Sequence, residues 1–420
     1  MAETSGRPAL YRWWALVLAA LINCLVGGVA WTIMPGLFNE ISQAPPIGLG
    51  LSLLQLGTIW GIFPLAIAIF SIPMGMAGDR YGVRPIIGGG LLLTAVAGAL
   101  RGTSAGFATL LVWMFLFGIG FSAIATNLVK FIGTWFPPKE LGMSNGIAVS
   151  LYSLGAGLAM QFGGSVISPA VGGWRNILFI SGGAIIIIAI LWMFTSREHK
   201  VAVTTIQVTQ PQDRGFFYGI NVALHTRDVW FLSAAQFTMM AGYIGLIGFL
   251  PIYLVDKGIS INTANGMVSL VLYALIAGNI VIPILSDRLG SRKWFYIPFV
   301  GASAIAVFFT AFATGGHLAL AHIIWGFTGG AATLIFVVPL EHPSIGPTLA
   351  GSATGLVIAM GNIGGFASPM IGNAIAEGIG GIAAITFWFA CYACSALAFI
   401  LVTETHPRRA KKEQARAKPD

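Results

Sequence analysis

Long apolar runs separated by short polar breaks dominate this chain. A helix needs about 20 mostly apolar residues to cross a hydrocarbon layer of about 30 Å. Dividing the runs at charged residues and at Pro or Gly predicts twelve such helices in two groups of six. The first group is expected at residues 13–38, 54–77, 85–104, 107–136, 141–168 and 174–195. The second group is expected at residues 228–254, 263–286, 294–313, 317–340, 349–376 and 381–403.

The composition excludes a water-soluble protein. Of the 420 residues, 56% are hydrophobic and only 9% are charged, which is typical of a polytopic membrane protein. One long polar stretch separates the two groups of helices, and a basic stretch ends the chain. The sequence therefore predicts an N-terminal six-helix bundle (1–196), a cytoplasmic linker (197–227), a C-terminal six-helix bundle (228–403) and a basic cytoplasmic tail (404–420).

The basic residues predict the orientation, because cytoplasmic loops retain most of the Lys and Arg. On this map all but three of the 22 Lys and Arg residues lie on the side of the termini, the exceptions being Arg101, Arg175 and Lys257. Both termini are thus expected in the cytoplasm, in a multi-pass protein of the cell inner membrane. The net charge of +8 is attributed to loops that face anionic membrane lipid, with no nucleic-acid partner. Arg101 is expected to snorkel outward.

Two similar blocks indicate an internal repeat. G-D-R-Y-G-V-R (78–84) and S-D-R-L-G-S-R (286–292) lie 208 positions apart, and each closes an apolar run. Three glycines of the first half also recur after 209 positions, so that Gly146, Gly155 and Gly172 match Gly355, Gly364 and Gly381. Parallel repeats of six helices are a known transporter architecture with the substrate between the halves. The expected fold is all-α, with two pseudo-symmetric six-helix bundles.

The block G-M-A-G-D-R-Y-G-V-R (75–84) resembles the signature loop between helices 2 and 3 of the major facilitator superfamily, and S-D-R-L-G-S-R resembles its second copy. The resemblance covers essentially residues 12–403. It implies that the two loops stabilise one access state of a transporter; the alternative is that their charges only set the topology. The implied gating residues are Gly75, Asp79, Arg80, Gly82, Arg84, Asp287, Arg288 and Arg292.

The fourteen acidic residues bear on ion coupling, because none lies at mid-membrane on this map. Proton-coupled carriers and cationic-drug pumps often use such a carboxylate, so both are disfavoured. Lys130, about two turns inside the end of helix 4, is predicted either to attract an anion or to snorkel. No nucleophile, metal cluster or cofactor site is expected, which argues against an enzyme. A channel or a transport-inactive receptor stays open as an alternative.

In the superfamily, helices 1, 4, 7 and 10 line the cavity, which implies a neutral and aromatic substrate site in this chain. Amides and phenols orient a small polar solute, and indole rings cover its apolar side. Hydrogen bonding between helices is the alternative role for each residue. The candidates on these four helices are Trp31, Asn127, Gln236, Tyr243, Trp325 and Thr333, and neighbouring helices add Tyr152, Gln161, Asn279 and Asn362.

The substrate class is suggested by residues 12–29, which are similar to helix 1 of oxalate/formate exchangers and related monocarboxylate carriers. Where those carriers place a basic residue on helices 8 and 11, this chain has Asn279 and Gly361. The first hypothesis is a carrier that moves a small organic anion, such as a monocarboxylate, by uniport or exchange. The carrier is expected to be monomeric. The second is an organic cation such as choline or ethanolamine, because carriers of those cations place a cation-facing Trp where Trp31 falls. A nitrate carrier ranks lower, since helix 2 lacks an Arg.

Overall fold

The described part of the chain contains twelve membrane-spanning helices, as the hydrophobic runs predict. The computed structural model describes residues 6–197 and 218–405, and within them twelve helices are long and apolar enough to cross a membrane. Each coincides with a predicted helix, and the ends differ by four residues at most. Most of the expected linker and nearly all of the expected tail lie outside the described residues.

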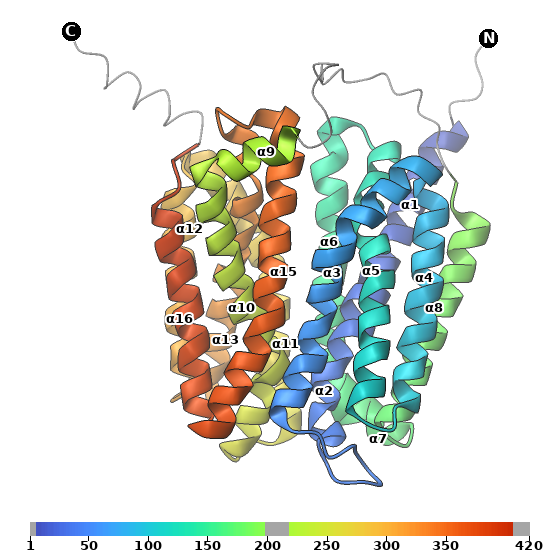
Figure 1. Ribbon diagram of the computed structural model, residues 1–420, viewed down its shortest axis with the longest axis vertical. Helices are drawn as coiled ribbons and strands as arrows, with labels where there is room; N and C mark the ends of the chain where they lie inside the picture. Colours follow the sequence, from blue (N-terminus) through green and yellow to red (C-terminus); the bar gives the residue numbers. More distant parts are fainter. Residues whose placement is uncertain (1–5, 198–217, 406–420) are drawn as a thin grey trace. The chain divides into compact units, whose positions relative to one another are not determined.

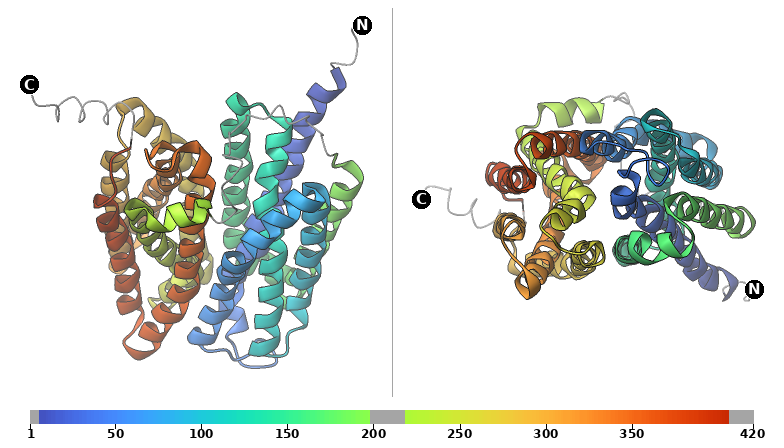
Figure 2. Two further views of the ribbon diagram at one scale, coloured as in Figure 1. Left: turned by 45° about the horizontal axis from the view of Figure 1, so that its top comes forward. Right: turned by 90° about the horizontal axis from the view of Figure 1, so that it is seen from below.

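The first six spans use helices α1 to α8 (Figures 1 and 2). The first span has three parts, because a π-helix, η1, interrupts it between α1 and α2; the third and fifth spans also end in short irregular helices. The elements are α1 Gly6–Ile22, η1 Asn23–Trp31, α2 Thr32–Ile41, α3 Leu53–Tyr81, α4 Val83–Leu100, η2 Arg101–Thr103, α5 Phe107–Trp135, α6 Pro138–Phe162, η3 Gly163–Ile167, α7 Ser168–Ala170 and α8 Trp174–Thr195.

The last six spans use helices α10 to α16 and follow a short helix, α9, which lies inside the predicted linker. The tenth span is broken by a 3₁₀ segment, η4. The elements are α9 Tyr218–His225, α10 Arg227–Asp256, α11 Ile261–Leu289, α12 Lys293–Thr310, α13 Gly315–Gly329, η4 Gly330–Phe336, α14 Val338–Glu341, α15 Gly346–Gly378 and α16 Gly381–Ile400.

The two sets of six spans repeat one local plan, which confirms the pseudo-symmetry expected from the sequence. Helices α3 and α11 each have 29 residues, and the helices that follow, α4 and α12, each have 18. One glycine with positive φ joins α3 to α4, Gly82 at 93°, and Gly290 at 73° occupies the matching turn. Glycine adopts such angles without steric cost. Helix α4 packs on α5 and α8, just as α12 packs on α13 and α16.

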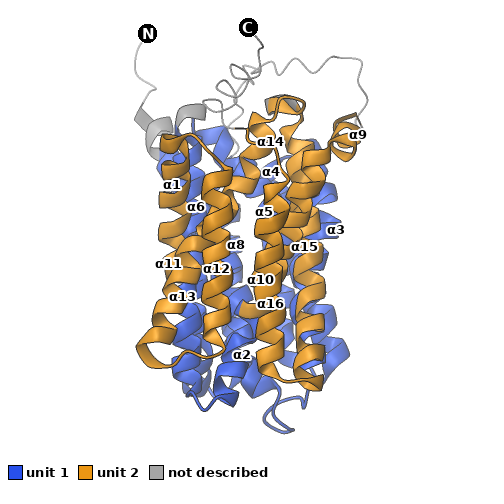
Figure 3. Cartoon of the chain, turned by 90° about the vertical axis from the view of Figure 1, so that its left-hand side faces the viewer, with its two compact units in different colours: residues 1–203, 247–272 blue, residues 204–246, 273–420 orange. Residues whose placement is uncertain are grey.

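The chain forms two compact units, whose boundaries cut across α10 and α11 (Figure 3). Unit 1 comprises residues 1–203 and 247–272, and unit 2 comprises residues 204–246 and 273–420. Within unit 1, Phe249 of α10 stacks on Phe38 of α2 with ring centroids 5.2 Å apart. Gly248 beside it lies against the indole of Trp60 on α3. The division into bundles at residues 196 and 228, which rests on the sequence repeat, stays a prediction.

Candidate functional site

The first span is irregular where its candidate residue lies. The π-helix η1 ends at Trp31, and Pro35 follows inside α2. A π-helical turn is rare and frequently marks a functional site. Gly28 of η1 meets the backbone of α6 directly, since a Cβ at this position would lie 2.6 Å from the Tyr152 carbonyl oxygen. The close approach holds the irregular turn against α6.

Trp31 is held by a cluster of aromatic rings. Its indole stacks on Trp60 at 4.6 Å and an interplanar angle of 10°, and on Phe63 at 4.7 Å and 18°. Tyr152 is tilted against it at 6.3 Å. Only 6% of Trp31 is exposed, yet its Nε1–H has no hydrogen-bond partner among the described residues. The ring faces are therefore covered, whereas the donor on the ring edge is unused.

Two buried candidates of unit 2 differ in whether their polar side-chain atoms have hydrogen-bond partners. Gln236 on α10 is 4% exposed, packs against Gly361, and has no partner for its Oε1 within the described part of the chain. Trp325 on α13 is also buried, but its Nε1 donates to the Tyr392 hydroxyl over 2.8 Å. Gln236 thus has an acceptor oxygen without a partner among the described residues, whereas Trp325 is bonded to α16.

The other candidates have local contacts, and substrate binding by them stays a prediction. Asn127 is buried and donates from Nδ2 to the Met74 carbonyl over 3.0 Å, which joins α5 to α3 as the helix-packing alternative expects. Tyr243 is half-buried on α10, next to a glycine that packs on Tyr392. The remaining contacts are Thr333 Oγ1 to the Gly330 carbonyl at 2.8 Å, Asn362 Nδ2 to the Ile358 carbonyl at 2.9 Å, the Gln161 carbonyl with the Ser165 hydroxyl, and the Asn279 backbone against Gly330.

Asn265 on α11 is a residue that the sequence analysis missed. It has no exposed surface, and within the described residues neither atom of its amide has a hydrogen-bond partner. An unpaired buried amide is costly, and Asn265 shares this feature with Trp31 in the described part of unit 1. An Asn one turn inside an apolar run was the available signal.

Arg101 does not snorkel, so that expectation is wrong. The 3₁₀ turn after α4 directs it inward, and it has no exposed surface. Its guanidinium donates to the carbonyls of Ala30 at 2.9 Å and Gly98 at 3.2 Å. The third contact is with the Met114 sulfur at 3.7 Å, and the Phe117 ring lies 4.2 Å from its Cζ.

Lys130 lies on α5 and binds two residues of the first signature loop. Its Nζ donates to Asp79 and, over 2.8 Å, to the Gly75 carbonyl. The side chains of both partners of the ion pair are partly exposed, 37% for Lys130 and 69% for Asp79. Lys130 therefore joins α5 to the end of α3, and anion attraction by it stays a prediction.

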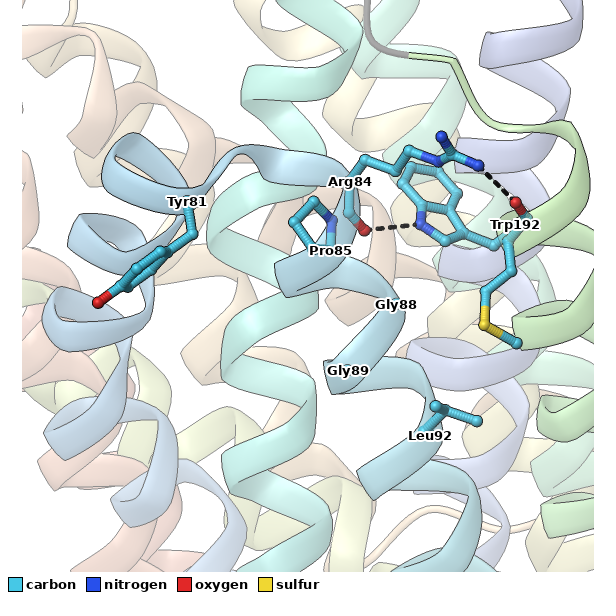
Figure 4. Close-up of a pocket in the computed structure, with 8 residues that line it drawn as sticks. Tyr81, Arg84, Pro85, Gly88, Gly89, Leu92 and Trp192 are labelled. Atoms are coloured by element: carbon cyan, nitrogen blue, oxygen red, sulfur yellow. Dashed lines mark hydrogen bonds between the residues drawn. The ribbon is translucent and has the colours of Figure 1, made fainter.

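The last residues of this loop border a groove beside the first half of α4 (Figure 4). Arg84 donates from Nη2 to the Met193 carbonyl over 2.6 Å and from Nε to the Ser196 hydroxyl over 3.1 Å. The Arg84 carbonyl accepts from Trp192 Nε1 at 3.0 Å. Arg80 is exposed and lies over the ring of Tyr81. The groove has a volume of about 460 Å³ and is lined by Tyr81, Arg84, Pro85, Gly88, Gly89, Leu92, Trp192 and Met193.

In the second signature loop, the matching arginine is buried in a charge cluster. Arg292 is 5% exposed and donates to Glu341 and Asp287, each over 2.6 Å. Burial alone would lower its pKa, but the hydrogen bonds that it donates to the Glu341 and Asp287 carboxylates outweigh burial and raise the pKa. Glu404 accepts the backbone N–H groups of Arg292 and Lys293, while Arg288 is exposed. The two signature loops are thus similar in sequence but differ in the ion pairs that they form.

Acidic residues of the described spans lie only at their ends. Each is within two residues of the first or last residue of its span, as for Glu40 in the span that ends at Ile41 and Asp256 at the end of the seventh. Glu40 is bound locally, accepting from the Ser168 hydroxyl at 2.6 Å and the Trp174 amide at 2.9 Å. The described spans therefore place no carboxylate at mid-membrane.

Comparison with known proteins agrees with this architecture. A family model described as the Major Facilitator Superfamily matches residues 16–369. The chain is 26% identical over 405 residues to the Probable nitrate/nitrite antiporter NarK1 of Thermus thermophilus, covering 88% of this chain and 87% of that protein. It is 24% identical over 330 residues to the 3-(3-hydroxy-phenyl)propionate transporter of Escherichia coli K12, covering 78% and 79%.

Among solved structures, the chain is similar to a bacterial homologue of the human lysosomal transporter Spinster in an inward-facing, occupied conformation. The TM-score is 0.72 at 19% sequence identity, and the match covers 93% of this chain and 95% of that one. At this identity the likeness shows a shared fold.

Proposed function

Because the chain belongs to the major facilitator superfamily, we propose that it is a secondary transporter that moves a small organic anion, such as a monocarboxylate, across the membrane. It works by alternating access, as a uniporter or an exchanger. The arrangement of the basic residues supports a cytoplasmic location for both termini. The bundle repeat supports a substrate site that is reached from one side at a time.

The observation that carries the proposal is the state of Trp31. Its faces are stacked on Trp60 and Phe63, and its Nε1–H has no partner in the described part of the chain. A cation cage needs an open ring face, and only 6% of this residue is exposed. A buried donor without a partner instead suits a ligand that accepts a hydrogen bond, and a carboxylate does so strongly.

Two further facts support an anion. The two relatives described above are named for nitrate or nitrite and for a phenylpropionate, all of which are anions at neutral pH. In the described spans the acidic side chains lie at the ends, so these spans provide no counter-charge for a cation at membrane depth. At 26% and 24% identity the relatives support a class of substrate rather than one compound.

Replacing Trp31 by Phe tests the donor. We expect Trp31→Phe to weaken binding of the transported anion about ten- to a hundredfold, because a hydrogen bond to a charged group contributes about 1.5–3 kcal/mol while the stacking is retained. Affinity is measured as the concentration of lactate, formate, nitrate or choline that raises the melting temperature of the purified protein.

Trp192→Phe is the matched control. It also removes an indole donor, but this donor already has a protein partner, the Arg84 carbonyl. This control should lose stability and keep the wild-type affinity. An anion affinity that is the same in Trp31→Phe and the wild type would contradict the assignment. A wild-type protein stabilised only by choline would favour the organic-cation alternative.

A further inference from the structure

Arg101 is a fully buried cation with neutral partners. Its exposed fraction is 0%, and its three hydrogen-bond acceptors are two carbonyl oxygens and a thioether sulfur. No ion pair among the described residues includes it. An arginine keeps its proton in proteins, so unit 1 contains a positive charge that is not paired with any acidic side chain of the described residues.

Such a charge is expensive to bury, and hydrogen bonds to neutral groups offset the cost only in part. Helix packing alone does not need it, because a neutral donor would satisfy the same carbonyls. The field of a buried charge is also screened much less than that of a surface charge. A charged side chain can attract a charged ligand that binds in unit 1. A neutral residue at position 101 could not do so.

The guanidinium is attached to the turn that carries Trp31. It donates to Ala30, the residue before Trp31, over 2.9 Å. Arg101 thus bonds to the backbone of the irregular turn, and the same contact fixes its charge near Trp31.

We propose that Arg101 is the fixed positive charge that makes this site select anions, acting through the Ala30–Trp31 turn without touching the substrate. The inference rests on the proposed function, which it deepens by naming a residue that determines charge specificity. With an effective dielectric constant of about 20 and a separation of about 10 Å, one unit charge changes the affinity for an anion by about tenfold. The effect on a neutral or cationic ligand should be absent or opposite.

The test neutralises the charge without removing the arginine. Met114 is fully buried, and its sulfur lies 3.7 Å from Arg101 Nη1. Met114→Glu places a carboxylate at that point, and Met114→Gln is a control of nearly the same shape without the charge. We expect Met114→Glu to weaken anion binding about tenfold and to leave choline binding unchanged or stronger, whereas Met114→Gln binds both as the wild type does.

The probes are lactate, nitrate and 3-(3-hydroxyphenyl)propionate as anions and choline as the cation, with binding measured on the purified full-length protein. Arg101→Lys, which keeps the charge, should bind anions better than Arg101→Gln. Equal anion affinity in the Met114→Glu and Met114→Gln proteins would show that Arg101 has only a packing role and would overturn the inference. A wild-type protein that binds none of the three anions would overturn the proposed function itself.

Discussion

Adding one methyl group at Gly330, by the change Gly330→Ala, is expected to prevent unit 2 from folding stably. A Cβ at Gly330 would lie 2.2 Å from the Gly278 carbonyl carbon and 2.5 Å from the Asn279 nitrogen. The opposite helix is equally close, since a Cβ at Gly278 of α11 would lie 2.0 Å from the carbonyl oxygen of Phe327 on α13. Helices in lipid associate through such backbone contacts, and backbone atoms cannot rotate away as a side chain would.

The expected loss is about 3 kcal/mol or more, at the upper end of the cost of overpacking. It is measured as a fall in the melting temperature and in the monodisperse yield of the detergent-purified protein. Gly266→Ala on α11 and Gly301→Ala on α12 are matched controls, because a Cβ at either position meets nothing within 4 Å. Both controls should keep the wild-type melting temperature or exceed it. A Gly330→Ala protein as stable as these controls would contradict the packing described here.

Removing the carboxylate of Glu341 is expected to destabilise unit 2 around its signature loop by about 3 kcal/mol, because it leaves a buried charge without its main partner. Arg292 is 5% exposed, and its Nη2 lies 2.6 Å from Glu341 Oε1. Asp287 also pairs with Arg292, but the Asp287 side chain is 63% exposed and its contribution is screened by solvent. The change is Glu341→Gln, which keeps the shape of the side chain.

Asp79→Asn in the first signature loop is the comparison for Glu341→Gln. It breaks the ion pair with Lys130, whose side chain is 37% exposed while that of Asp79 is 69% exposed, so a loss below about 1 kcal/mol is expected. Thermal melting of both proteins measures the difference. If the two changes lowered the melting temperature equally, Arg292 would not depend on Glu341 as proposed.

The fold was predictable because hydrophobic length alone defines a membrane span. All twelve predicted helices are present, and the repeat of the signature loops correctly indicated two copies of one plan. The irregular turn in the first span was not predicted, although Pro35 lies next to it. The turn depends on tertiary packing, because Gly28 lies directly against the backbone of α6 there.

The candidate site was predictable in part. The superfamily resemblance pointed to Trp31, but neither the stacking on Trp60 nor the unused N–H can be read from one helix. Trp325 binds Tyr392, which lies 67 residues away in the chain. The Arg101 prediction failed because a basic residue near a span end can point either way, and the 3₁₀ turn after α4 decides the direction. Asn265 was missed because its burial depends on tertiary packing.

Counterflow in proteoliposomes tests the central claim most directly. Vesicles that contain the purified protein are loaded with an unlabelled monocarboxylate, and uptake of the labelled compound is followed with no imposed pH gradient. The account predicts rapid exchange of the anion that the wild type binds, slowed in the Trp31→Phe protein. Exchange of labelled choline alone, or anion uptake that occurs only when a pH gradient is imposed, would contradict it.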